Sequence, residues 1–135
     1  MRTDWDVRMP SAADDIASDI TSRWADCFSK FDAEAQASLY SRHALFFGSN
    51  PTLYQGRDGV TAYFKGLPKW NSRAVRFTDV NTAQINPELV NFAAIASFDV
   101  NGAPKLSVKI TWVIAREDGD WKIVSHHVSS KAPLI

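Results

Sequence analysis

The spacing of apolar residues changes once along this chain of 135 residues, and that change limits the folds open to it. In the first half, apolar residues recur at helical spacing, beginning with Ile16, Ile20 and Trp24. From Val75 onwards they alternate with polar residues, which is typical of strands. Helices followed by strands predict an α+β fold, with three N-terminal helices packed on a curved antiparallel sheet.

Capping and stop signals give the expected helices. The first follows a cap at Ser11, and its apolar stripe consists of Ile16, Ile20, Trp24, Cys27, Phe28 and Phe31. The second runs from the capping Asp32 through Tyr40, and the third covers Arg57–Leu67. Residues 1–10 are expected to form a flexible arm, and residues 11–135 a single domain.

The expected strands are separated by turn signals. They are Ala44–Phe47, a strand from Val75 with a bulge near Asp79–Val80, Leu89–Val100, Lys105–Arg116 and Trp121–Ser130. Asn101-Gly102 and Asp118-Gly119 are typical two-residue hairpin turns.

The last hairpin has two predicted faces. A two-residue turn at Asp118-Gly119 pairs Trp112 with Ser125 and Ile110 with His127, so these residues share the more apolar, inner face. The outer face then carries Lys109, Thr111, Val113, Val124, His126 and Val128. Its three valines favour a subunit interface over a plain solvated sheet. A bulge in the final strand would exchange the positions of His126 and His127.

Composition excludes several classes of protein. Fifteen basic and fifteen acidic residues balance, which argues against a nucleic-acid or membrane-surface partner. Cys27 is the only cysteine, so the chain forms no internal disulfide and no cysteine metal cluster. Without a secretory signal or an apolar run of membrane-spanning length, a cytoplasmic domain with no metal and no cofactor is expected.

Several segments resemble a known superfamily. The run Lys109–Val113, the hairpin Arg116–Val124 and the tail His126–Pro133 resemble the C-terminal signature of NTF2-like proteins. Within that superfamily they are similar to the SnoaL-like branch and to the branch of the calcium/calmodulin-dependent protein kinase II association domain. The resemblance spans about residues 12 to 133 and implies a cystatin-like cone with a deep pocket. It also implies association, mostly as homodimers, through the outer sheet face. It is specific for fold and weak for function, because this fold hosts enzymes and non-catalytic modules alike.

The resemblance also places the charged residues that relatives use. The carboxylate base and the two oxyanion donors of the steroid isomerases fall on Gly48, Trp24 and Thr111. The arginines in the pocket of the kinase association domain fall on or near Trp112, Val128 and Ala93–Ala94. Neither set is kept, so steroid isomerisation by the family mechanism is not expected.

An apolar, aromatic pocket with few polar groups is what remains. Its expected ligand-binding residues are Trp24, Phe28, Tyr54, Tyr63, Phe98, Trp112, Ser125 and His127. Candidate catalytic residues are His127 as a base near neutral pH, Asp99 as its acid partner and Tyr54 as a hydroxyl donor. The competing interpretations are a structural histidine, a solvated hairpin aspartate and a packed loop tyrosine.

Two functions stay open on the sequence alone. One is an enzyme of isomerase, cyclase or dehydratase type that acts on a small apolar or aromatic molecule. The other is a non-catalytic ligand-binding or association module.

Overall fold

The computed structural model describes residues 12–135, and the expected arm at residues 1–10 and the cap at Ser11 lie outside them. In chain order the described elements are α2 (Ala12–Ser29), α3 (Ala33–Ala37), β1 (Tyr40–Phe47), β2 (Leu53–Gln55), α4 (Gly56–Lys65), β3 (Arg73–Asn86), β4 (Leu89–Val100), β5 (Ala103–Glu117) and β6 (Asp120–Ser130). The helices precede the long strands, so the α+β class is confirmed.

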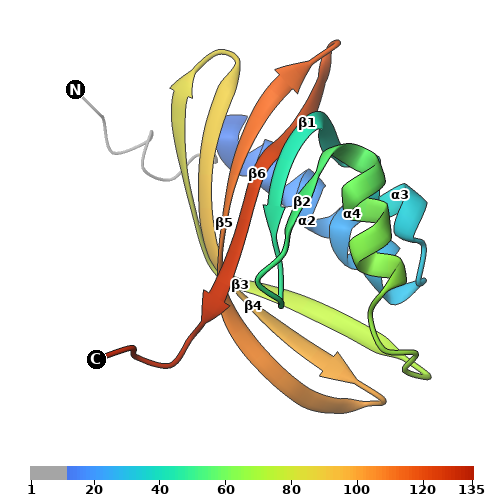
Figure 1. Ribbon diagram of the computed structural model, residues 1–135. Helices are drawn as coiled ribbons and strands as arrows, with labels where there is room; N and C mark the ends of the chain where they lie inside the picture. Colours follow the sequence, from blue (N-terminus) through green and yellow to red (C-terminus); the bar gives the residue numbers. More distant parts are fainter. Residues whose placement is uncertain (1–11) are drawn as a thin grey trace.

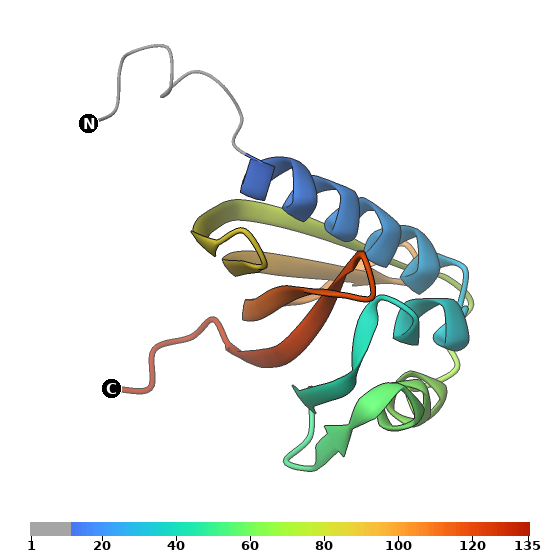
Figure 2. The same ribbon diagram turned by 90° about the horizontal axis from the view of Figure 1, so that it is seen from above.

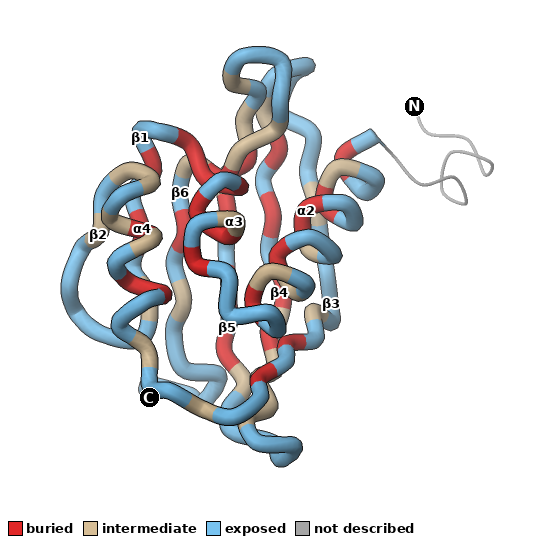
Figure 3. Tube along the Cα trace, turned by 90° about the vertical axis from the view of Figure 1, so that its right-hand side faces the viewer, coloured by how far each residue is buried: buried red, intermediate tan, exposed pale blue. Residues whose placement is uncertain are grey.

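The described helices lie on one face of a curved sheet, and the opposite face is left open (Figures 1 and 2). α2 packs against β3, and α4 packs against β1 and α3. Buried residues concentrate on the strands behind the helices and on the helix sides that face them (Figure 3). None of the described helices is long and apolar enough to cross a membrane.

α2 is held by one buried stripe. Its buried residues, spaced three or four apart, are Ala13, Ala17, Ile20, Trp24 and Phe28. The predicted stripe is therefore right at Ile20, Trp24 and Phe28, whereas Cys27 is only half-buried. Phe31 is 41% exposed because the helix ends at Ser29 and the backbone of Phe31 turns to a φ of 57°.

The two shorter helices begin close to where their signals place them and end earlier than predicted. The carboxylate of Asp32 accepts a hydrogen bond from the backbone N–H of Ala35 at 3.0 Å, which caps α3 as predicted. α3 ends earlier than expected, at Ala37, and Tyr40 begins β1 instead of closing the helix. α4 buries Val60, Tyr63 and Phe64 against the sheet.

The sheet differs from a simple meander at one edge. Its strand order is β2-β1-β6-β5-β4-β3, and β1 runs parallel to β6, whereas the other neighbouring strands are antiparallel. The expectation of a wholly antiparallel sheet is corrected at this pair. The short strand β2, which pairs Leu53 with Phe47, has no counterpart among the expected strands.

A bulge in β6 changes the predicted facing of the last hairpin. Ile114 pairs with Ile123 but Val113 pairs with Ser125, so Val124 is an extra residue on its strand. Beyond it, Trp112 pairs with His126 and Ile110 with Val128, instead of with Ser125 and His127 as predicted. His126 and Val128 therefore face the helices, and Ser125 and His127 face outwards. Lys109, Thr111 and Val113 keep the outer face that the sequence gives them.

The expected bulge in β3 and both tight turns are present. The pairing of β3 with β4 shifts between Thr78 and Asn81, where Asp79 has a φ of 51°. Asn101 and Gly102 have φ values of 52° and 79°, and Asp118 and Gly119 have φ values of 54° and 84°. Two consecutive positive φ angles are the signature of the mirror-image turn that matches strand twist.

Asn101 combines this backbone with a side-chain acceptor. Its Oδ1 accepts hydrogen bonds from the N–H groups of Asn71 and Ser72 at 2.8 and 3.3 Å. Asn101→Gly keeps the backbone freedom but removes the acceptor, so we expect its unfolding free energy in urea to fall by about 1 kcal/mol. Asn101→Asp, the matched control, keeps the acceptor and should remain near wild type. Equal stability of the two variants would contradict this role.

Candidate functional site

A cavity of about 420 Å³ lies between the helices and the concave face of the sheet. Trp24 and Phe28 of α2 form one wall, and Tyr63 and Phe64 of α4 form another. The lining residues contributed by the sheet and by the segments after β1 and α4 are Phe46, Gly48, Ser49, Leu67, Trp70, Phe98, Val100, Lys105, Leu106, Ser107, Val108, Ile110, His126, Val128, Ser129 and Ser130. Among the described lining residues there is no aspartate, glutamate or arginine.

The wall of the cavity is a continuous aromatic cluster. The ring of Trp24 stacks on Phe28 at 5.3 Å between ring centroids and meets the edge of Phe64 at 5.7 Å. The ring of Phe46 stacks on the imidazole of His126 at 3.9 Å. Such flat, apolar surfaces favour ligands that carry rings of their own.

A chain of buried hydrogen bonds ends on one nitrogen of His126. The indole Nε1–H of Trp24 donates to the hydroxyl of Tyr40 at 2.9 Å, and that hydroxyl lies 2.8 Å from Nδ1 of His126. The indole Nε1–H of Trp112 donates to the same Nδ1 at 2.9 Å. These contacts join α2, β1, β5 and β6 behind the cavity wall.

These contacts decide the protonation of His126. An indole nitrogen is only a donor, so Nδ1 must carry a lone pair and no proton. Burial, and secondarily the neighbouring His127, lower the pKa of His126 to about 3. The imidazole is therefore neutral at physiological pH, with its proton on Nε2. Among the residues described, none is in hydrogen-bonding contact with Nε2, and His126 lines the cavity.

Tyr40 is a structural link in this chain. It is fully buried, and burial raises the pKa of its hydroxyl above the usual value. The hydroxyl accepts the proton of Trp24 and donates its own to Nδ1 of His126, so both of its hydrogen-bonding functions are used.

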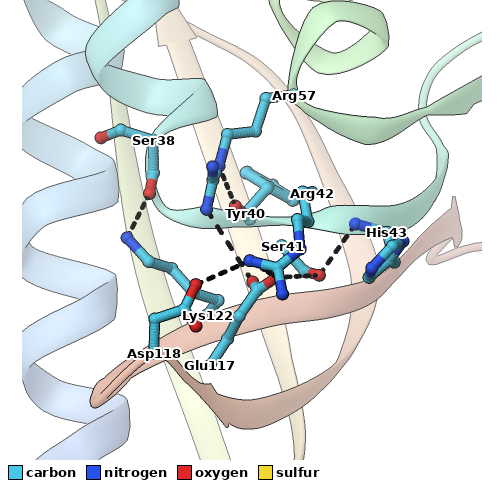
Figure 4. A network of polar contacts seen from close by, with 9 residues as sticks. All are labelled: Ser38, Tyr40, Ser41, Arg42, His43, Arg57, Glu117, Asp118 and Lys122. Carbon is cyan, nitrogen blue, oxygen red and sulfur yellow. Dashed lines mark hydrogen bonds and ion pairs between the residues drawn. The ribbon is translucent and has the colours of Figure 1, made fainter.

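Outside the cavity, an ionic network fixes the start of β1 (Figure 4). Nε of Arg57 donates to the backbone carbonyl of Tyr40 at 2.9 Å, and its Nη2 lies 3.8 Å from Oε2 of Glu117. The other oxygen of Glu117 accepts from the hydroxyl of Ser41 at 3.3 Å and pairs with Arg42 at 3.4 Å. The Glu117 side chain is 12% exposed, so these partly buried contacts connect the β5–β6 hairpin to β1.

Tyr63 occupies the space beside Gly48 in the cavity lining. Its hydroxyl donates to Oγ of Ser49 at 2.8 Å and accepts from the N–H of Ser49 at 2.9 Å. A Cβ on Gly48 would collide with the Tyr63 ring. A carboxylate at the position that relatives use for their base would therefore displace Tyr63.

Four predicted ligand-binding residues line this cavity, namely Trp24, Phe28, Tyr63 and Phe98. Trp112 lies behind the lining and is 1% exposed. Tyr54 packs against Tyr63 and Phe46, and its hydroxyl accepts from Asn50 at 3.2 Å, away from the lining. A role in binding a ligand stays a prediction for all of them.

The predicted pair of His127 and Asp99 is not formed. The β6 bulge turns His127 to the outer face, where it contacts the ring of Phe47. Asp99 pairs with Arg76 at 2.7 Å. Thr111 also faces outwards, and the same bulge moves Ser125 to that face.

Sequence reasoning missed Phe46, Phe64 and Tyr40, and it placed His126 on the inner face only for the case of a bulge in the final strand. Helical spacing in α4 could have indicated Phe64, and alternation in β1 could have indicated Phe46. His126 depends on a bulge for which the sequence of β6 gives no signal. In the described part of the chain, no three histidine, cysteine, aspartate or glutamate side chains gather as metal ligands would.

Comparisons with known proteins agree on the fold. A sequence model of the SnoaL-like domain matches residues 18–133. No protein of curated function matches the sequence of the chain. A structure from Xanthomonas campestris, named as a calcium/calmodulin-dependent protein kinase II association domain, is 18% identical, with a TM-score of 0.79 over 93% of this chain and 91% of that one.

Two further structures are similar in the same way. One from Novosphingobium aromaticivorans, named as a scytalone dehydratase, is 11% identical, with a TM-score of 0.78 over 87% of this chain and 83% of that one. An NTF2-like protein of unknown function from Pseudomonas putida is 14% identical, with a TM-score of 0.76 over 91% of this chain and 89% of that one. At such identities the similarity shows a cystatin-like, NTF2-like fold, as predicted.

Because His126 is buried and neutral, we expect the unfolding free energy of the protein to decrease at acid pH. The unfolded chain accepts a proton on this residue below pH ~6.5, whereas the folded chain does so only near pH 3. This contribution to stability is therefore complete above pH ~6.5 and is lost as the pH falls towards 3, by up to about 1.4 kcal/mol per pH unit. His126→Asn keeps an acceptor near Nδ1 without titrating in this range, so its urea-unfolding free energy should depend less steeply on pH.

His127→Asn is the matched control, because His127 is exposed on the adjacent position of the same strand. It should keep the wild-type slope. Parallel pH profiles for wild type and His126→Asn would show that His126 is not the acid-sensitive group.

Proposed function

The chain belongs to the SnoaL-like domain family, and on that premise we propose that it binds a small, largely apolar molecule with aromatic or fused rings in the aromatic cavity. A volume of about 420 Å³ falls within the range of small-molecule sites, roughly 300–1,000 Å³. The aromatic rings around the cavity offer stacking surfaces for a flat molecule. The absence of acidic residues from the described lining disfavours cationic ligands.

His126 would supply the orienting hydrogen bond. Its Nδ1 is occupied by Tyr40 and Trp112, which leaves Nε2–H as a donor. A donor in an apolar cavity favours a ligand with a carbonyl or similar acceptor, because an unpaired polar group in such a site is costly. The arrangement of His126 is the observation that carries this proposal.

The same arrangement favours binding over proton-transfer catalysis. A general base needs a free lone pair and a pKa near the working pH. The lone pair of His126 already accepts two hydrogen bonds, and its pKa is about 3. The described lining of the cavity offers no carboxylate to replace it.

An enzyme of isomerase, cyclase or dehydratase type is the second candidate. A neutral imidazole can polarise the carbonyl group of a substrate by donating a hydrogen bond from its N–H. The likeness to a structure named as a scytalone dehydratase supports this candidate. Such an enzyme would use His126 as a hydrogen-bond donor, and not His127 as a base.

A matched pair of probes tests the orienting donor. Naphthyl methyl ketone carries an acceptor, and isopropenylnaphthalene has the same shape without it. Tryptophan fluorescence should report binding, because Trp24 and Trp70 line the cavity. We expect wild type to prefer the ketone by about tenfold, and His126→Asn to lose that preference.

Two further variants locate the binding. Val128→Phe adds bulk inside the cavity and should weaken both probes, whereas His127→Asn on the outer face should change neither. Equal affinity of wild type for the two probes would overturn the role of His126. Unchanged binding by Val128→Phe would overturn the cavity as the site.

We also propose that the outer sheet face forms a homodimer interface, with membership corrected for the bulge. Leu45 and Phe47, which are 50% and 39% exposed, stand beside Ser125 and His127 on this face. Together with Thr111 and Val113 they form a patch of mixed apolar and polar side chains, and no described element lies over this face of the sheet (Figure 2). His126 and Val128, predicted for this face, belong to the inner one.

The dimer can be tested by light scattering. The molar mass of the wild type should be twice that of the chain. The double variant Leu45→Glu, Phe47→Glu should be a folded monomer, because the two introduced charges would be buried and unpaired in the interface and oppose association. Ile85→Glu changes an exposed apolar residue on the β3–β4 hairpin, with 57% exposure, and should leave the dimer intact. A monomeric wild type would contradict the proposal.

A further inference from the structure

A second, smaller cavity of about 210 Å³ lies on the other side of the aromatic wall. It is formed where α3 begins, where α4 ends and where β3 begins. It shares Phe64 and Leu67 with the aromatic cavity. Its remaining lining residues are Phe31, Asp32, Ala33, Glu34, Lys65, Pro68, Lys69 and Arg73.

Arg73 is the unusual member of this lining. It is only 6% exposed, and its Nε donates to the backbone carbonyl of Phe28 at 2.6 Å. Its guanidinium carbon lies 4.2 Å from the ring centroid of Phe28 and 4.3 Å from that of Phe31. These contacts fix the plane of the guanidinium and remove it from most of the solvent.

The charge of Arg73 has no counter-ion in the described part of the chain. No carboxylate there lies within 4.0 Å of its nitrogens, and only Nε has a hydrogen-bond acceptor. The carboxylates nearest along the lining are otherwise engaged, because Asp32 caps α3 and Glu34 pairs with Lys65 at 3.4 Å. Burial lowers the pKa of Arg73, with no carboxylate to oppose the effect.

A buried cation with no anion among its described neighbours is rare, since desolvation of the charge is costly unless an anion compensates it. Arginine remains protonated even so, because its ordinary pKa is far above neutrality. The two terminal nitrogens of a guanidinium present a planar fork that matches two oxygens of a carboxylate or phosphate. Arg73 thus has the geometry of an anion anchor and lacks the anion.

We propose that this cavity is a binding site for a small oxyanion, a carboxylate or phosphate group, held bidentately by Arg73. Lys69 stands on the same lining and adds positive charge beside the anion, whereas the charge of Lys65 is already paired with Glu34. With Asp32 and Glu34, the lining carries three basic against two acidic side chains. The site is independent of the ligand proposed for the aromatic cavity and would stand if that proposal failed.

The test is an NMR titration of the full chain with sodium phosphate and, separately, sodium acetate. Ionic strength is held constant with sodium chloride, which removes general screening. We expect at least one oxyanion to shift the Nε–H signal of Arg73 and the backbone amides of residues 31–34, 65–67 and 69 to a saturating end point. The anion that binds more tightly shows whether the site prefers a phosphate or a carboxylate group.

Three variants test whether anion binding depends on Arg73 and on this cavity. Arg73→Lys keeps the charge but loses the fork and should bind at least about tenfold more weakly. Arg76→Lys changes an exposed arginine on the same strand, which pairs with Asp99, and should bind as wild type does. Lys69→Gln leaves the buried Arg73 in place, so a several-fold loss of affinity is measurable even if Arg73→Lys does not fold.

The overturning results are equally definite. Linear, non-saturating shifts with both anions would show that no oxyanion site exists. Wild-type affinity in a folded Arg73→Lys, an equal loss in Arg76→Lys, or no loss in Lys69→Gln where Arg73→Lys does not fold, would show that binding does not depend on this cavity.

Discussion

The hydrogen bonds that converge on Nδ1 of His126 connect the helical layer to the sheet. A buried indole N–H must find an acceptor, and here Trp24 reaches one through Tyr40 while Trp112 reaches one directly. The four residues come from α2, β1, β6 and β5, so the position of each element is constrained by the others. The ionic network around Glu117 adds a second constraint on β1 from outside the cavity (Figure 4). The concave wall of the cavity is held in shape by both.

The sequence predicted what local chemistry decides. Helix caps, apolar spacing and the two positive-φ turns identified α2, α3, α4 and the long hairpins, because each signal acts within a few residues. The bulge at Val124 is different, since whether a strand gains a residue depends on how its partner and the helices accept the resulting side chains. Because Val124 is an extra residue, His126 faces the cavity and His127, the expected base, faces outwards. The parallel pairing of β1 with β6 was not predicted for the same reason, because it depends on contacts between segments distant in sequence.

Charge in this molecule is arranged by separation. Ionic pairs such as Arg42 with Asp118 lie outside the aromatic cavity, whose described lining is charged only at Lys105. A single aromatic layer divides this cavity from the positively charged one: the ring of Phe28 stacks on Trp24 and also contacts the guanidinium of Arg73. The sequence has equal numbers of acidic and basic residues, yet the two neighbouring cavities differ in charge. One is almost free of charged side chains, and the other contains Arg73, which has no counter-ion among the described residues.

The parallel pairing of β1 with β6 also bears on how the chain acquires its structure during synthesis. Tyr40 and Phe46 face their partners Ile123 and His126 only when the last strand has left the ribosome. Until then β1 has no neighbour on one side, and its two buried aromatic side chains have no complete core to enter. Contacts so distant in sequence slow folding, because a long loop must close before they form. Docking of β1 against β6 is therefore a late and slow contact in the folding of this domain.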